Sequence, residues 1–210
     1  MASQHSHLPL PEPGPGIKDN GQLAAWLGLI SYTFFLATFV AANVYLRGWR
    51  PEVFGVKVPA EVSNLSYLST LLLLVTGGIL LIAGVLFRNG SYKKFLGTMS
   101  IGALLYSGYL LLQIQLLKKY IALGAAIATI NATITGFQIL ITLTSLVFIA
   151  AVGWYGDSKD GKVLRRLVPG AMAVWMYSVV VGLVVMIVTD VVSVSEFAAW
   201  CGTRLTELVK

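Results

Sequence analysis

Five stretches without any charged side chain alternate with short charged segments along the sequence. They cover residues 20–46, 62–87, 95–117, 120–156 and 167–189. The shortest of them has 23 residues, and about 20 mainly apolar residues are enough for a helix to cross the hydrocarbon core of a bilayer. The pattern therefore predicts an all-α fold, an integral membrane bundle of five transmembrane helices.

The longest uncharged stretch, Tyr120–Gly156, has 37 residues. Two spans and a turn need more chain than this, so we predict one long, tilted helix whose first turns lie in the membrane interface. Its small and polar residues recur at spacings of three and four, which places them on one helix face. These residues are Gly124, Ala128, Asn131, Thr135, Gln138, Thr142 and Ser145.

This face has two interpretations. Small residues let helices approach closely in lipid and polar residues form hydrogen bonds between helices, so we favour a packing seam. The alternative is a path lined by water or substrate along Asn131, Gln138 and Thr142, which requires a cavity beside these side chains.

The other helices are placed by their flanking residues. We predict helices from Leu23 to about Arg47, from Asn64 to Phe87, from Phe95 to Leu117, and over 167–189. A loop is expected over 51–61, the pair Lys118-Lys119 is expected to end the third helix, and Pro169 is expected in the first turn of the last helix. The first helix carries small residues on one face, namely Ala24, Gly28, Ser31, Thr38 and Ala42. The last helix has a similar face, formed by Ala171, Trp175, Ser178, Gly182 and Thr189.

These predictions divide the chain into three segments. Residues 1–22 form a flexible N-terminal tail rich in proline and glycine, whose alternating prolines disfavour helix. Residues 23–192 form the five-helix membrane domain. Residues 193–210 form an amphipathic C-terminal tail, in which Ser193 and Glu196 have the spacing of a helix cap.

Composition agrees with a membrane protein. The chain is 57% hydrophobic and 11% charged, and its mean hydropathy is +0.80. Nearly all residues outside the predicted spans lie in short loops, so we expect no soluble catalytic domain. The net charge of +6 is spread over all the loops, so it does not indicate binding to nucleic acid.

The sequence also predicts little intrinsic chemistry. Both histidines, His5 and His7, lie in the N-terminal tail, so we expect no haem or copper ligand within the bilayer. Cys201 is the only cysteine, and Asp190 near the end of the last helix is interpreted as an interfacial carboxylate. We therefore predict no catalytic, cofactor-binding or metal-binding residue in this chain.

The candidate site residues are instead those expected to contact neighbouring helices or a partner protein. They are Gly124, Ala128, Asn131, Thr135, Gly136, Gln138, Thr142, Ser145, Trp175, Ser178 and Gly182.

Four stretches resemble the short, five-helix bacterial form of cytochrome c oxidase subunit III, a family of haem-copper oxidase subunits. Trp26-Leu27 with Phe34-Phe35 is similar to the family's first helix, and Leu68–Leu74 is similar to its N-T-L-L-L-L run. Tyr109–Gln113 is similar to its F-L-x-x-Q run, and Thr135-Gly136-Phe137 resembles the start of its T-G-[FL]-H-x-x-H signature. The resemblance extends over about residues 23–192.

Ionisable residues of the family motifs are replaced by uncharged ones at matching positions. Ser31 and Leu116 stand where the family has glutamates within the membrane, and Gln138 and Ile141 stand where it has histidines. In the last helix Trp175 is kept, whereas Met176 and Val179 replace a histidine and an aspartate.

The resemblance implies a non-catalytic subunit that packs on the catalytic subunit I of a respiratory oxidase, alongside other subunits of the complex. It implies haem and copper in partner subunits, none in this chain, and bound phospholipid. It further implies a multi-pass protein of the bacterial cell membrane with a cytoplasmic N-terminus. The basic residues agree weakly, because eight then lie on the cytoplasmic side and seven on the other.

Two other functions remain open from the sequence. The chain is compatible with a membrane anchor or assembly subunit of another, quinone-linked respiratory complex. It is also compatible with a small transporter or channel, although it shows neither inverted repeats nor charged residues within the spans.

Overall fold

The computed structural model describes residues 20–54, 58–157 and 161–191. Residues 1–19 of the predicted N-terminal tail, with both histidines, lie outside the described residues. The predicted C-terminal tail, residues 193–210 with Cys201, also lies outside them.

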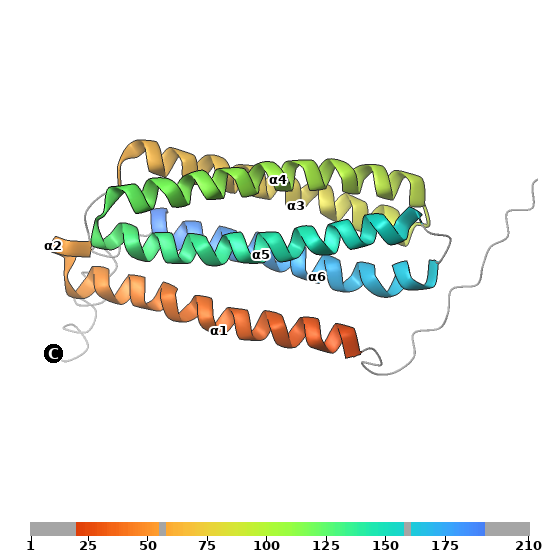
Figure 1. The fold of residues 1–210 in the computed structure, drawn as a ribbon, viewed down its shortest axis with the longest axis horizontal. Helices are drawn as coiled ribbons and strands as arrows, with labels where there is room; N and C mark the ends of the chain where they lie inside the picture. Colours follow the sequence, from red (N-terminus) through yellow and green to blue (C-terminus); the bar gives the residue numbers. More distant parts are fainter. Residues whose placement is uncertain (1–19, 55–57, 158–160, 192–210) are drawn as a thin grey trace, which may run out of the picture.

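The described residues form five long helices, which run roughly parallel or antiparallel to one another (Figure 1). They are α1 (Asn20–Trp49), α3 (Ala60–Arg88), α4 (Tyr92–Leu123), α5 (Ala126–Asp157) and α6 (Gly161–Met186). A short helix, α2 (Pro51–Phe54), follows α1, and a π-helical turn, η1 (Ile187–Val191), continues α6. Each long helix contains a span that is long and apolar enough to cross a membrane.

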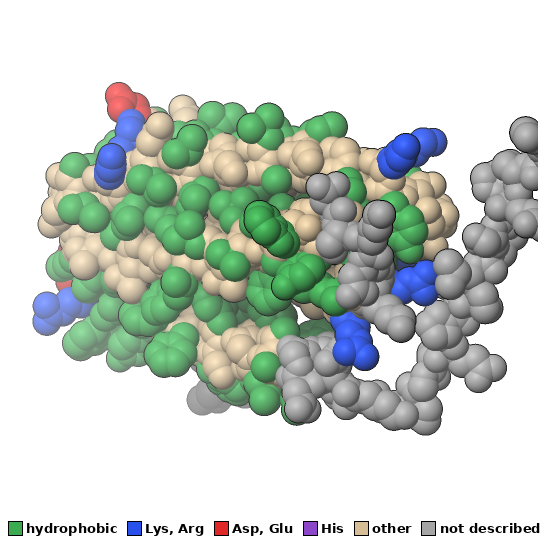
Figure 2. All heavy atoms as spheres, turned by 45° about the vertical axis from the view of Figure 1, so that its right-hand side comes forward, with side chains coloured by type: hydrophobic (Ala, Val, Ile, Leu, Met, Phe, Trp, Pro, Cys, Tyr) green, Lys and Arg blue, Asp and Glu red, His purple; other side chains and the backbone are tan. Residues whose placement is uncertain are grey.

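The surface has the distribution of polarity that a bilayer requires. On the face drawn in Figure 2, hydrophobic side chains cover the middle of the bundle, and Lys and Arg side chains lie at its two ends. Large hydrophobic side chains point outward along the spans, for example Phe34 (71% exposed) and Leu104 (75% exposed). The chain is thus an all-α, multi-pass integral membrane bundle of five transmembrane helices, which confirms the predicted fold class.

Helices α3, α4, α5 and α6 form a group, and α1 lies along one side of it (Figure 1). The core of the group is apolar in one half of the bundle, where Leu80, Ala83, Phe95 and Val152 are completely buried. Helix α1 contributes few buried side chains, which recur every seven residues at Leu29, Leu36 and Asn43. Its predicted small-residue face is not covered by the described residues, because Gly28, Ser31 and Thr38 are exposed.

The prediction of one helix over Tyr120–Gly156 is wrong. Helix α4 continues past Lys118 and Lys119 to Leu123, and α5 begins only at Ala126. Gly124 separates them in the left-handed conformation (φ 60°), and its N–H donates to the carbonyl of Ile121. Glycine is favoured at this position of a helix end because it has no Cβ to clash, so the turn depends on one uncharged residue.

Two other boundaries differ from the prediction. Helix α6 begins at Gly161, so Pro169 lies within the helix and not in its first turn. The ring of a proline removes one backbone hydrogen bond and favours a bend there. The predicted loop over 51–61 contains α2 and the first residues of α3.

Candidate functional site

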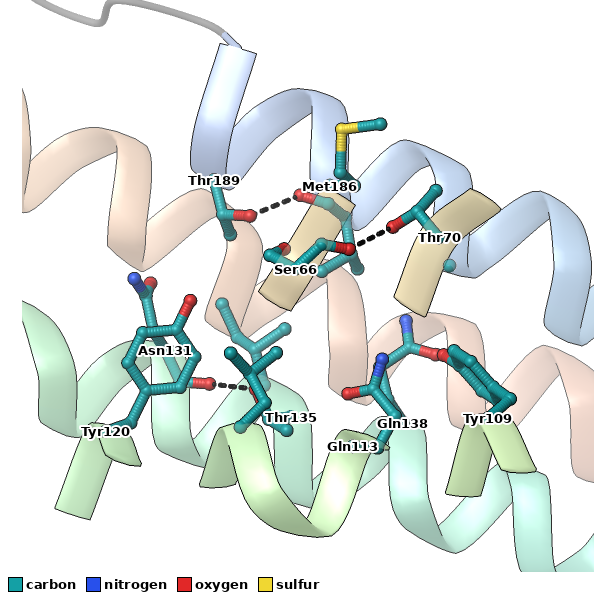
Figure 3. Close-up of a pocket in the computed structure, with 14 residues that line it drawn as sticks. Ser66, Thr70, Tyr109, Gln113, Tyr120, Asn131, Thr135, Gln138, Met186 and Thr189 are labelled. Carbon is teal, nitrogen blue, oxygen red and sulfur yellow. Dashed lines mark hydrogen bonds between the residues drawn. The ribbon is translucent and has the colours of Figure 1, made fainter. Parts of the chain in front are cut away.

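A polar cavity of about 30 Å³ lies between α3, α4, α5 and α6 (Figure 3). Its lining alternates hydroxyl, amide and apolar side chains contributed by all four helices. The lining residues are Ser66, Thr70, Tyr109, Gln113, Leu116, Tyr120, Asn131, Ile134, Thr135, Gln138, Gly182, Val185, Met186 and Thr189.

Helical periodicity explains why these residues meet. On α5 the lining positions 131, 134, 135 and 138 follow spacings of three and four, as do positions 109, 113, 116 and 120 on α4. All lining residues come from the same half of the bundle, the first half of α3 and α5 and the second half of α4 and α6. The cavity is therefore confined to this half.

The predicted small and polar face of α5 points into the bundle. Six of its seven residues are buried, with exposed fractions of 5% or less, namely Ala128, Asn131, Thr135, Gln138, Thr142 and Ser145. Gly124 does not belong to this face of α5, because it caps the end of α4, and it is exposed. Gly136 does not form a close approach, because a Cβ there would meet no other atom within 4 Å.

The hydroxyl hydrogens of this face bond within α5 itself. Thr135, Thr142 and Ser145 each donate to the carbonyl four residues earlier in α5, at 2.6–2.8 Å. Such bonds satisfy the hydroxyl hydrogen locally and leave lone pairs on the oxygen. The hydroxyl oxygens therefore remain able to accept hydrogen bonds.

Buried amides are the unusual feature of the site. Gln138 is 2% exposed, and neither its Oε1 nor its Nε2 has a hydrogen-bond partner within the described residues. Asn131 is also 2% exposed, and its Oδ1 accepts a bond from Nδ2 of Asn43 in α1 at 2.8 Å. Its Nδ2 has no partner among these residues, and neither has Oδ1 of Asn43. A buried polar group without a partner costs about 1–3 kcal/mol.

A chain of hydrogen bonds connects the cavity with the end of α6. Nε2 of Gln113 donates to Oγ of Ser69 (3.3 Å), which donates to the carbonyl of Ser66 (2.8 Å). Oγ of Ser66 in turn donates to Oδ2 of Asp190 at 2.7 Å. Oγ1 of Thr189 shares its one hydrogen between this oxygen (3.1 Å) and the carbonyl of Val185 (2.9 Å). Asp190 thus lies at one end of the cavity and is held by two of its lining residues.

Arg47 fixes α1 to the same end of the bundle. Its guanidinium donates to the carbonyls of Val188 (3.3 Å) and Thr189 (2.8 Å). The last carbonyls of a helix lack partners within the helix and carry partial negative charge, so a cation stabilises them. The sequence places Arg47 only near the end of the first helix and does not predict this contact.

The predicted site residues of α6 lie where the cavity meets the apolar half of the core. Nε1 of Trp175 donates to the carbonyl of Ser145 at 3.1 Å, and the hydroxyls of Ser178 and Tyr106 are 2.6 Å apart. A Cβ on Gly182 would lie 2.3 Å from Cδ2 of Leu73, so the Leu73 side chain of α3 packs directly against the backbone of α6 there. These contacts close the cavity toward the other half of the bundle.

The part of the chain that the structure describes contains no group of three or more His, Cys, Asp or Glu side chains arranged to hold a metal ion. The site thus contains neutral hydrogen-bond donors and acceptors enclosed by four helices.

Comparison with protein-family models and with curated proteins gives no match.

Proposed function

We propose that this chain is a non-catalytic integral-membrane subunit of a respiratory haem-copper oxidase complex, similar to subunit III. One observation carries the proposal. Three of the stretches that resemble the family supply Thr70, Gln113 and Thr135, and these residues line one cavity although at least 22 positions separate them in sequence. Their convergence in one cavity is the observation that supports the proposal.

In this proposal the subunit stabilises the complex by packing against the catalytic subunit I. Helix α1 offers a suitable surface, because Gly28, Ser31 and Thr38 are exposed on one face and a Cβ on Gly28 would meet nothing within 4 Å. A face of small residues allows the backbone of another transmembrane helix to approach closely. We therefore place the partner helix on this face of α1.

The proposal assigns haem and copper to the partner subunits and places this chain in the bacterial cell membrane, with its N-terminus in the cytoplasm. Phospholipid is expected to cover the remaining apolar surface. The chain contributes contact area and shape, and its function is to maintain the complex during aerobic electron transport.

The confinement of the cavity weighs against a transporter. A transport path needs polar lining across the whole membrane, whereas the half of the bundle beyond Gly182 is filled by completely buried side chains such as Leu80, Phe95 and Val152. A membrane anchor for another respiratory complex shares the packing role and differs only in its partner.

Co-purification tests the proposal. The tagged chain is extracted from its native membrane in a mild detergent, and the proteins that elute with it are identified by mass spectrometry. We expect the catalytic subunit of a haem-copper oxidase in stoichiometric amount. Elution with subunits of a different, quinone-linked complex would contradict the proposal and support the anchor function.

A matched pair of variants tests the contact surface. Gly28→Leu places a bulky side chain on the proposed interface, whereas Gly78→Leu does so on an exposed position of α3 where a Cβ also meets nothing. We expect Gly28→Leu to reduce recovery of the partner and Gly78→Leu to leave it unchanged. Equal recovery of the partner with both variants would show that this face of α1 is not the interface.

A further inference from the structure

We propose that the polar cavity is a binding site for about two water molecules, which hydrogen-bond the buried amides of Gln138 and Asn131. The starting observation is that both ends of the Gln138 amide lack partners although this side chain is 2% exposed (Figure 3). The amide lies in the cavity wall together with Gln113 and Tyr109. Nearly all buried polar groups in proteins are hydrogen-bonded, so a ligand is expected here.

The chemistry of the amides selects a neutral ligand that both donates and accepts. A cation would satisfy Oε1 of Gln138 and leave its Nε2, and Nδ2 of Asn131, without an acceptor. An anion would satisfy the two N–H₂ groups and leave Oε1 without a donor. Water satisfies both kinds of group in one site.

The size of the cavity selects a small ligand. Holding one water requires about 10–15 Å³ of such volume, and the cavity has about 30 Å³. About two waters therefore fit in this space. A buried water typically makes about three hydrogen bonds, and the hydroxyl oxygens of Thr70 and Thr135 provide further acceptors because their hydrogens already bond to backbone carbonyls.

We expect water to enter this site at the end where Asp190 lies. Ser66 and Thr189 line the cavity and both bond the carboxylate of Asp190, which is only partly buried at the end of α6. The opposite end is closed by Leu73, which packs against Gly182 and is 1% exposed. The site is thus a hydrated cavity that is closed at one end, and not a channel across the membrane.

Water-edited solid-state NMR of the full chain in liposomes tests this inference without any mutation. Phe137-Gln138 is the only Phe-Gln pair and Val174-Trp175 the only Val-Trp pair in the sequence. Labelling each pair with ¹³C and ¹⁵N therefore identifies Gln138 and Trp175 unambiguously. The indole N–H of Trp175 is an internal control, because it is buried and already donates to the carbonyl of Ser145.

We expect the side-chain amide of Gln138 to receive magnetisation from water at short mixing times, with several-fold greater intensity than the indole of Trp175. Replacing sodium and potassium salts with sucrose should leave the Gln138 signals unshifted. Equal, negligible transfer to both residues would overturn the proposal. A salt-dependent shift of the Gln138 carbonyl would also overturn it and would identify a cation site.

Discussion

Gly182 provides a quantitative test of how α3 and α6 pack. A Cβ at this position would lie 2.3 Å from Cδ2 of Leu73, the shortest such distance at any described glycine. Leu73 is 1% exposed and cannot turn out into lipid. Gly182→Ala must therefore push Leu73 or the two helix backbones apart.

The expected cost follows from two opposing effects. Adding a methylene to a filled core costs about 1–3 kcal/mol. Replacing glycine by alanine within a helix contributes about 1 kcal/mol of stabilisation. Gly78→Ala has only the second effect, because a Cβ at Gly78 meets nothing within 4 Å. The two variants should therefore differ in unfolding free energy by about 1–3 kcal/mol.

Reversible unfolding in mixed detergent micelles measures this difference. Gly182→Ala should unfold more easily than Gly78→Ala, and the double variant Gly182→Ala/Leu73→Val should recover part of the loss, because valine lacks the contacting methyl position. Equal stability of the two alanine variants would refute the close approach of α3 and α6. Absence of rescue would show that Leu73 is not the side chain that obstructs the new methyl group.

Three further predictions concern polar contacts. Arg47→Leu removes charge-assisted hydrogen bonds to two carbonyls of η1 and should lower the unfolding free energy by about 1.5–3 kcal/mol. Lys119→Leu breaks an exposed ion pair with Glu61 and should cost less than about 1 kcal/mol. Equal losses in micelle unfolding would contradict the capping role of Arg47. Trp175→Phe removes one bond between helices, worth about 0.6 kcal/mol, and also shrinks a completely buried side chain of the apolar core. The total loss should therefore exceed about 0.6 kcal/mol, and a smaller loss in micelle unfolding would contradict both roles of the indole. Gln138→Leu should leave assembly and turnover of the partner complex near normal, and retained assembly with lost turnover would instead favour a conducting path through the cavity.

The sequence was sufficient to predict the five spans because charges mark where each helix leaves the membrane. It was insufficient for the turn at Gly124, which lies inside an uncharged stretch. The pair Lys118-Lys119 suggested a helix end six residues too early, at Leu117, since both side chains are exposed and the helix continues beyond them to Leu123. The glycine itself was the available signal, because glycine is common just after the last residue of a helix.

The candidate site was predicted only in part. The periodicity of α5 placed Asn131, Thr135 and Gln138 on one face, and the structure buries all three. The cavity beside them depends on how four helices pack, which no local pattern encodes. The contact between Asn43 and Asn131 joins residues 88 positions apart, and neither position indicates its partner.

The most direct test of the proposed function is the haem content of the chain with and without its partners. The tagged chain is purified from native membranes in mild detergent, and its reduced-minus-oxidised spectrum and haem-to-chain ratio are measured before and after dissociation of the complex. We expect haem in fixed ratio to the chain in the complex and no Soret band in the isolated, folded chain. A complex without haem, or a stoichiometric Soret band that remains with the isolated chain, would contradict it.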